Sequence, residues 1–367
     1  MPEPAPGATS SATLGTPPAS ARPADAAARI AWLDGARGLG IVFVVIGHAL
    51  GGLIDSPLGP GLLGFRQAYF AIYTFHMPLF FVLAGLMVEG RLARGQERFL
   101  RGLLPTLVWP YFLWSVVQFS AIWAAGSLVN RPAGDWWATV LALPWRPVSQ
   151  FWFLQALACL HLVAAFALPR IGREGLLLLG LAARSLAFAV PLDPVLRLIL
   201  VNLAWYALGV WLGVGGLQRL VVNRPAWLTV GAMPLVAGGV ILATLAGAGH
   251  YAADLPLATA SSPQAASLAW RLPAGAAAIA GTLAVIGLSA WPRLGAGGVL
   301  AALGRATMAI YLLHVLFVAG VRIVLVRAGL ADPLLILPVL VVAGLAGPLL
   351  VRHLARALGL AGPLGLG

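Results

Sequence analysis

Ten predominantly apolar segments, each about 20 residues long, constrain the fold of this 367-residue chain more than any other feature. A helix needs about 20 apolar residues to cross the hydrocarbon core of a bilayer, so these segments predict membrane spans. The predicted fold class is an all-α membrane protein built as a bundle of about ten transmembrane helices. The expected spans are residues 33–54, 68–88, 103–126, 151–169, 175–191, 195–214, 226–248, 270–290, 303–321 and 333–351.

The composition excludes a soluble globular protein. Hydrophobic residues make up 60% of the chain and charged residues only 9%, whereas soluble domains carry about 25% charged residues. Too few polar side chains are present to cover a water-exposed surface. Residues 1–30, rich in Ala, Pro, Gly, Ser and Thr, are predicted to be a disordered tail. We expect one membrane domain over residues 31–358 and a short C-terminal tail over residues 359–367.

The positive charge of the chain predicts its orientation in the membrane. All 23 basic residues are Arg, and the net charge is +12. These Arg residues lie singly or in small groups between apolar spans, which is typical of topology-setting loops, so we expect no nucleic-acid partner. With a cytoplasmic N-terminus, 15 Arg fall on the cytoplasmic side and 7 on the other. The positive-inside rule therefore predicts that both termini are cytoplasmic.

Three histidines lie at a similar depth in three different spans. His48, His76 and His314 are roughly 9–12 Å from the outer ends of their spans. Ionisable side chains inside a bilayer are costly and indicate function. The ordinary pKa of histidine, near 6.5, suits a general base. A zinc site is the alternative, but no carboxylate lies at that depth, so we predict no metal. We interpret His161, in the middle of another span, as a packing residue.

Two groups of polar residues share helix faces. Arg37 and His48 are eleven positions apart, which is 20° past three full turns, so they lie on one face about 16 Å apart along the axis. Thr307, Tyr311 and His314, spaced by four and three, lie on one face of the ninth span. Each group alone is compatible with contacts between helices. Together they predict a polar cavity inside the bundle.

Four motifs resemble the integral-membrane acyltransferase 3 family, and within it the fucose 4-O-acetylase-like branch. They are Leu33-Asp34-Gly35-Ala36-Arg37-Gly38 leading to Val45-Ile46-Gly47-His48, Phe75-His76-Met77-Pro78-Leu79-Phe80-Phe81-Val82-Leu83-Ala84-Gly85, Phe151-Trp152-Phe153-Leu154-Gln155-Ala156-Leu157, and Leu303-Gly304-Arg305-Ala306-Thr307-Met308-Ala309-Ile310-Tyr311-Leu312-Leu313-His314. The motifs occur in the order expected for the family. The sequence departs from the pattern at Ala84, where the branch usually has Ser, and at Gln155, where the family often has Pro.

The resemblance implies a membrane-bound O-acyltransferase of the bacterial inner (plasma) membrane. Such an enzyme moves acetyl from acetyl-CoA to a hydroxyl of a sugar, glycan or small molecule outside the cytoplasm. Acyl-CoA is then a co-substrate rather than a permanently bound cofactor. On this interpretation Arg37 binds the donor, since guanidinium groups bind phosphate well, and His48 is catalytic, either as the base or as a covalent acyl carrier. The residues expected to line the cavity or the acceptor side are His76, His314, Tyr311 and Thr307.

A multi-helix secondary transporter is the alternative from another class, because ten spans with buried His and Arg residues also suit a transporter. The lack of a clear internal repeat and the scarcity of acidic residues inside the spans favour the enzyme. Labelled acetyl-CoA distinguishes the two, since only an acyltransferase passes the label to an acceptor.

Overall fold

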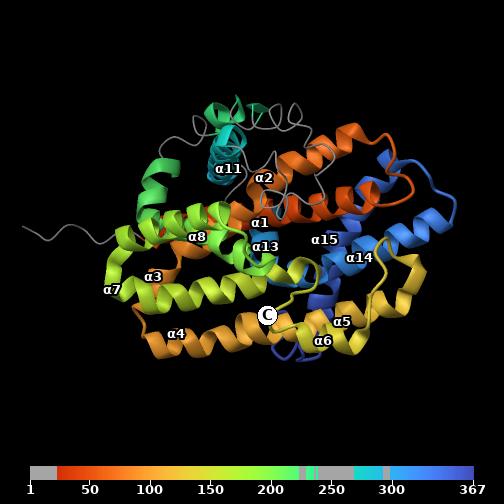
Figure 1. The fold of residues 1–367 in the computed structure, drawn as a ribbon, viewed down its shortest axis with the longest axis horizontal. Helices are drawn as coiled ribbons and strands as arrows, with labels where there is room; N and C mark the ends of the chain where they lie inside the picture. The colour runs from red at the N-terminus through yellow and green to blue at the C-terminus, as the bar shows by residue number, and fades with distance from the viewer. Residues whose placement is uncertain (1–22, 223–228, 235–236, 239–267, 292–297) are drawn as a thin grey trace, which may run out of the picture.

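The computed structural model describes residues 23–222, 229–234, 237–238, 268–291 and 298–367. Within these ranges the chain forms helices and turns and no strand, which confirms the predicted all-α fold class (Figure 1). The α-helices are α1 (Pro23–Ile54), α2 (Leu63–Leu86), α3 (Val88–Leu92), α4 (Gln96–Leu103), α5 (Trp109–Ala125), α6 (Trp136–Ala142), α7 (Trp152–Ala189), α8 (Pro194–Val222), α11 (Leu268–Ser289), α13 (Val299–Arg305), α14 (Thr307–Arg327) and α15 (Pro333–Ala357). Shorter helical turns are η1 (Leu104–Val108), η2 (Gly126–Leu128) and η3 (Ser149–Phe151).

Seven helical stretches of the described residues are long and apolar enough to cross a membrane. Three changes explain why the structure has seven such stretches where the sequence predicts ten spans. The expected spans at 151–169 and 175–191 belong to one continuous stretch that contains α7. The expected span at 270–290 coincides with α11, where the stretch that qualifies as apolar is the shorter Gly275–Ser289. The expected span at 226–248 lies largely outside the described residues.

Helix α7 consists of two limbs that meet at Gly172. This residue has φ 68° and ψ −173°, a backbone conformation that residues other than glycine rarely adopt. The chain reverses direction here, at the left of Figure 1, so that α8 packs along both limbs. The sequence predicts this reversal, because Arg170, Arg173 and Glu174 separate the expected spans at 151–169 and 175–191.

Helices α1 and α13 are in backbone contact. A Cβ atom on Gly38 would lie 1.9 Å from the carbonyl oxygen of Leu300, and a Cβ atom on Gly304 would lie 1.9 Å from that of Asp34. Only glycine leaves room for two helices to approach this closely. Both glycines belong to sequence motifs noted above, and their packing holds Arg37 beside the start of α14.

Ion pairs divide the molecule into two ends. Each one recorded between different described segments joins loops or helix ends that the sequence places on the same side of the membrane. Those expected at the cytoplasmic side are Arg173–Glu89 and Arg305–Asp34, and those expected at the other side are Arg131–Asp55 and Arg146–Asp193. We call the end that holds α3 and the reversal of α7 the inner end, and the end that holds the α1–α2 and α14–α15 turns the outer end (left and right in Figure 1).

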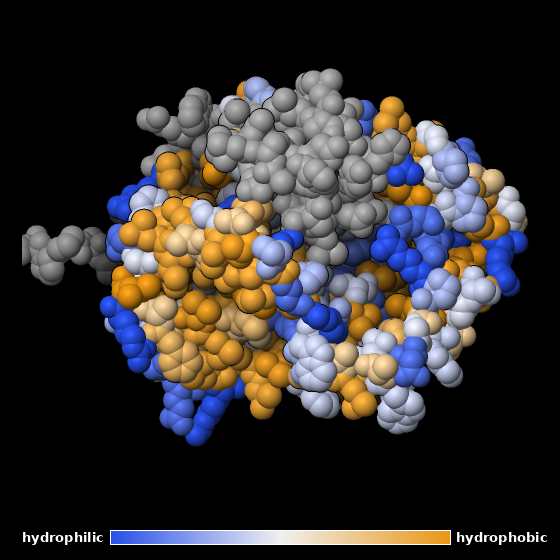
Figure 2. Space-filling view, viewed as in Figure 1, coloured by the Kyte–Doolittle hydropathy of each residue, from blue (hydrophilic) through white to orange (hydrophobic). Residues whose placement is uncertain are grey.

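The surface over α7 and α8 is apolar. Leu178, Leu181, Leu186 and Trp211 are all exposed on these helices. Figure 2 shows apolar side chains gathered over this region, with hydrophilic side chains at the edge beside the inner end. Large apolar side chains exposed together on long helices face lipid rather than water. The chain is therefore an integral membrane protein.

The two expected tails differ in what the structure describes. Residues 1–22 lie outside the described residues, and α1 begins at Pro23, within the stretch expected to be a tail. Residues 358–367 form turns that pack against α5. The indole N–H groups of Trp109 and Trp114 donate to the carbonyl oxygens of Pro363 and Leu364, at 2.7 and 2.8 Å.

Candidate active site

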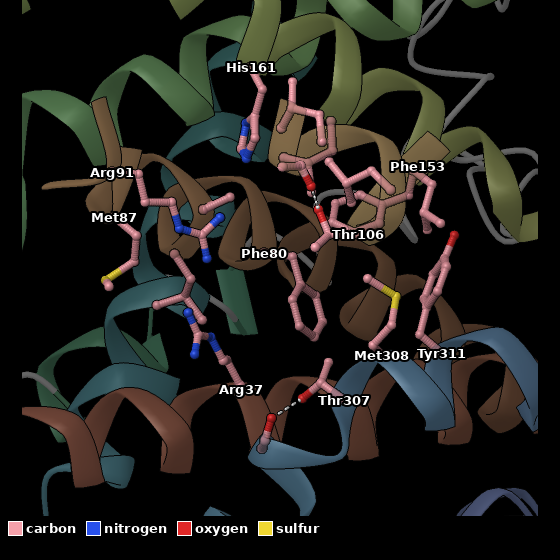
Figure 3. Close-up of a pocket in the computed structure, with 18 of the residues that line it drawn as sticks. Arg37, Phe80, Met87, Arg91, Thr106, Phe153, His161, Thr307, Met308 and Tyr311 are labelled. Atoms are coloured by element: carbon pink, nitrogen blue, oxygen red, sulfur yellow. Dashed lines mark hydrogen bonds between the residues drawn. The ribbon is translucent and has the colours of Figure 1, made fainter. Parts of the chain in front are cut away.

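A cavity of about 720 Å³ lies between α1, α2, α4, α7 and α14 (Figure 3). Small-molecule sites typically occupy about 300–1,000 Å³, so this cavity has room for a cofactor-sized ligand. Its lining changes in character along its length. Charged side chains surround the part near the inner end, and aromatic and apolar side chains surround the part that reaches toward the middle of the bundle.

The inner part of the cavity is strongly cationic. Its five arginines are Arg37, Arg91, Arg94, Arg98 and Arg305, and Asp34 is the acidic side chain among the described lining residues. Figure 3 shows the guanidinium groups of Arg37 and Arg91 pointing into the same space from α1 and α3. Five guanidinium groups facing one carboxylate leave an excess of positive charge, so this part of the cavity attracts anions.

Arg37 keeps most of its hydrogen-bond donors available to a ligand. Its Nη1 donates to Asp34 Oδ1 at 3.4 Å, and Asp34 also faces Arg305 at 3.9 Å. A guanidinium carries five N–H donors, and this contact occupies one of them. Asp34 therefore orients Arg37 toward the cavity without neutralising the group of arginines around it.

The far part of the cavity is aromatic. Phe80, Phe153, Met308 and Tyr311 line it, and Figure 3 shows Phe153, Met308 and Tyr311 together at this end. The ring centroids of Phe153 and Tyr311 are 5.6 Å apart. The Tyr311 hydroxyl donates to the backbone carbonyl of Gln150. The cavity thus reaches a tyrosine whose hydroxyl is hydrogen-bonded and whose ring packs against Phe153.

Two histidines lie directly beyond this end. Val44 and Tyr311 line the cavity, and His48 and His314 follow them by four and three residues on the same helices. The imidazole centroids of His48 and His314 are 4.9 Å apart, with the rings edge to face. One helical turn, about 5.4 Å along the axis, therefore separates the end of the cavity from the histidine pair.

The hydrogen bonds of His314 determine which ring nitrogen carries its proton. Nδ1 lies 3.0 Å from the carbonyl oxygen of Ile310 and 2.9 Å from that of Tyr311. Carbonyl oxygens only accept, so Nδ1 carries the hydrogen and Nε2 presents a lone pair in the neutral ring. His314 is fully buried, and Nε2 has no hydrogen-bond partner. This nitrogen is available to bind a substrate hydroxyl or a proton.

His76 approaches the pair through an aromatic ring. Its Nδ1 donates to the carbonyl oxygen of Ile72 at 2.8 Å, and its ring lies 4.5 Å from the ring of Tyr73. The Tyr73 ring lies in turn 6.3 Å from His48. His76 is thus one side chain removed from the pair. Among the described residues, no three His, Cys, Asp or Glu side chains are placed to hold a metal ion.

Thr307 and Tyr311 line the cavity, but their hydroxyl groups are already used. The Thr307 hydroxyl donates to the carbonyl oxygen of Gly304 at 2.7 Å, and the Tyr311 hydroxyl donates to Gln150. A hydroxyl has one proton to donate. In this arrangement neither hydroxyl has a hydrogen left to donate to a ligand, and both residues shape the wall of the cavity.

The sequence analysis missed several lining residues. His161, interpreted as a packing residue, lines the inner half of the cavity and shares a 3.0 Å hydrogen bond with the Tyr206 hydroxyl. Arg91, Arg94 and Arg98 were interpreted as topology charges only. Their clustering within a few residues, from α3 through the turn before α4 into α4 itself, is the signal that the analysis did not use.

Comparison with known proteins identifies the family. The model of the acyltransferase 3 family, described as an acyltransferase domain, matches residues 30–353. The nodulation protein NolL of Mesorhizobium japonicum is 28% identical over 173 residues, which are 45% of this chain and 43% of that protein. The match therefore spans less than half of this relative. No solved structure matches the chain. The predicted family is confirmed, while the fucose 4-O-acetylase-like branch stays a prediction. The chain belongs to the acyltransferase 3 family of integral membrane proteins.

Proposed function

We propose that this protein transfers an acetyl group from acetyl-CoA to a hydroxyl of a sugar, glycan or similar small molecule on the other side of a bacterial plasma membrane. The observation that carries the proposal is the path through the bundle. It begins among five arginines, passes aromatic side chains and ends one helical turn from His48 and His314. Such a path joins a site for an anionic donor to a pair of histidines suited to proton transfer.

The chemistry of coenzyme A matches the gradient along the cavity. Its diphosphate and ribose phosphate groups suit the arginines, because guanidinium groups bind phosphate oxygens through paired hydrogen bonds. Its pantetheine arm is long and thin, and the part of the cavity near Phe80 and Met308 is lined mostly by apolar side chains. With the phosphates at Arg37 and Arg91, the thioester points toward Tyr311 and the histidine pair.

His48 is the proposed base. It accepts the proton of the acceptor hydroxyl while the hydroxyl oxygen attacks the thioester carbonyl carbon. The new C–O bond forms, the C–S bond breaks, and the proton passes to the departing thiolate to give free coenzyme A. The neighbouring His314, with its Nε2 lone pair, orients the hydroxyl or stabilises protonated His48. A covalent acyl-histidine intermediate is the alternative route.

The test is a transfer assay with the purified protein in detergent. Acetyl-CoA labelled in the acetyl group is mixed with hydroxyl acceptors, and label is followed into the acceptor and into free acetate. We expect label in an acceptor, or thioester hydrolysis when no acceptor suits. A protein that does neither, and instead moves a solute in proteoliposomes, would be a transporter.

The proposed direction requires the inner end to face the cytoplasm. The excess of Arg at that end supports this orientation. Single cysteines in the 127–150 loop of a Cys159→Ala background should react with an impermeant thiol reagent in intact cells, and cysteines near the termini should not. The opposite labelling pattern would place the donor cavity outside the cytoplasm, where acetyl-CoA does not occur, and would end the proposal.

The native acceptor is proposed from the position of the histidine pair. An extracytoplasmic glycan fits because the acceptor must reach the histidine pair from the outer end. Mass spectrometry of the surface glycans and secreted small molecules of a deletion strain identifies the acceptor as the molecule that loses an acetyl group, a mass of about 42 Da.

A further inference from the structure

Among the described residues, one arginine is buried at the outer end, far from the arginines of the cavity. Arg322 on α14 is only 6% exposed. Its Nη1 donates to Asn130 Oδ1 at 2.6 Å, and Asn130 Nδ2 donates to the carbonyl oxygen of Gly52 at 2.9 Å. This short chain of hydrogen bonds fixes the guanidinium against α1.

The charge of Arg322 has no direct counterion among the described residues. None of their carboxylates forms an ion pair with it. Asp55 attracts it over a longer distance but is paired with Arg131 at 2.9 Å. The Nε–H group of Arg322 is buried and has no hydrogen-bond partner. A buried charge that is neither paired nor fully hydrogen-bonded is costly, so an arginine in this state is suited to binding an anion.

The position of Arg322 relates it to the histidine pair. A Cβ atom on Gly52 would lie 3.7 Å from Arg322 Nε, so the guanidinium lies against this residue. Gly52 follows His48 by four residues on α1, which is about 6 Å further toward the outer end. An acceptor that brings a hydroxyl to His48 from the outer side passes Arg322. The separation is comparable with the length of one sugar residue.

We propose that Arg322 is a specificity determinant that binds an anionic group of the acceptor, a carboxylate or a phosphate located about one sugar residue from the hydroxyl that is acetylated. The inference rests on the proposed function for the direction in which the acceptor enters. The anion is the counterion that Arg322 lacks, and it accepts a hydrogen bond from the unpartnered Nε–H group. An acidic sugar, such as a uronic acid or a sugar phosphate, has this arrangement of groups.

Three sugars that differ only at C6 test the proposal. Glucose, glucuronate and glucose 6-phosphate offer the same ring, neutral or with a carboxylate or a phosphate. Binding to the purified protein is measured by thermal shift at constant ionic strength, with saturating coenzyme A to fill the cationic cavity. We expect one of the two anionic sugars to bind at least about tenfold more tightly than glucose, as a charge-assisted contact allows. The anionic sugar that binds more tightly than glucose shows whether the site prefers a carboxylate or a phosphate.

Three variants locate the effect. Arg322→Gln removes the cation, and Asn130→Asp supplies an internal carboxylate at the oxygen that now accepts from Arg322. Both should reduce the preference for the anionic sugar to less than about twofold. Arg327→Gln is the matched control, since Arg327 lies on the same helix and is exposed. This variant should keep the preference. A wild-type protein that binds all three sugars equally, or a preference that survives Arg322→Gln, overturns the proposal.

The transfer assay separates this inference from the proposed function. Label that enters glucose and the anionic sugars with equal kcat/KM refutes the anion site and leaves acetyl transfer intact. Binding of an anionic sugar that depends on Arg322, in a protein that never consumes acetyl-CoA, supports the anion site and refutes acetyl transfer.

Discussion

The two ends of the bundle handle positive charge in different ways. At the inner end, five arginines surround a cavity and stay in part exposed, with 30% of the Arg37 side chain and 58% of the Arg305 side chain accessible. At the outer end, one arginine is buried to 6% exposure and held by an asparagine. Exposed cations attract a highly charged ligand at small desolvation cost, whereas a buried cation discriminates strongly between neutral and charged partners. The inner end is suited to affinity and the outer end to selection.

The largest effect on acetyl transfer is expected from substitution of His48, between the cationic cavity and the outer end. We expect His48→Ala to lower acetyl transfer by about 10²- to 10⁴-fold, the usual contribution of a general base, and to leave binding of coenzyme A unchanged. The measurement is label transfer together with thermal-shift titration of coenzyme A. His353→Ala, at an exposed position of α15, is the control. Wild-type transfer by the His48 variant would remove this residue from the reaction.

A smaller effect is expected from the inner end alone. Arg37→Ala should raise the KM for acetyl-CoA by about tenfold with little change in kcat, because the lost contact is made equally in the bound and reacting states. Arg37→Lys should recover only part, since the paired hydrogen bonds of a guanidinium are lost. Arg101→Gln is the control, because this side chain is 80% exposed and is paired with Glu97. An unchanged KM in both Arg37 variants would show that the inner arginines only set topology.

The contact that supports the inner end gives a prediction about stability. Gly304→Ala places a Cβ atom within 1.9 Å of the Asp34 carbonyl oxygen, so α1 and α13 must move apart. Overpacking of this kind costs about 1–3 kcal/mol, and the melting temperature in detergent should fall. Gly320→Ala, where no atom lies within 4 Å of the added Cβ, should melt at or slightly above the wild-type temperature. Equal melting of the two variants would contradict the backbone contact.

The smallest effect is expected from the exposed ion pair of the outer end. Arg146 donates to Asp193 at 2.5 Å, and this hydrogen bond holds the pKa of the Asp193 carboxyl below its usual range. A lowered folded-state pKa means that the stabilisation exists above the unfolded pKa, near 3.9, and is lost as the pH falls through the folded value. Asp193→Asn should therefore lower the melting temperature slightly at pH 7, and by less at pH 3. A larger loss at pH 3 than at pH 7 would reverse the sign of this argument.

Most membrane spans were predictable because each span is a run of mostly apolar residues in the sequence. The depth of His48, His76 and His314 is also readable, since it depends only on counting residues from the end of a span. Which neighbour each histidine contacts depends instead on how the helices rotate toward one another. His48 lies beside His314, which is distant in sequence, whereas His76 is separated from it by Tyr73.

Features that depend on the tertiary structure were not predictable. The spans expected at 151–169 and 175–191 correspond to the two limbs that meet at Gly172, but their packing against α8 does not follow from the sequence. The cationic cavity draws Arg91 and Arg305 from segments more than 200 residues apart, and only the folded chain brings them together. The hydroxyl of Tyr311 donates to the backbone carbonyl of Gln150, which is distant in sequence, so only the folded chain determines this partner.

The aromatic end of the cavity has a bioenergetic consequence. Tyr311 stands between the cavity and the histidine pair, with its hydroxyl tied to Gln150 and its ring against Phe153. A pore open to both compartments would short-circuit the proton gradient that a bacterium keeps across its plasma membrane. Under the proposed function, this aromatic layer passes one small acyl group while the nucleotide part of the donor stays among the arginines of the cavity. On that view, the cell delivers the energy of a cytoplasmic thioester to the exterior without exporting the coenzyme and without an electrical leak.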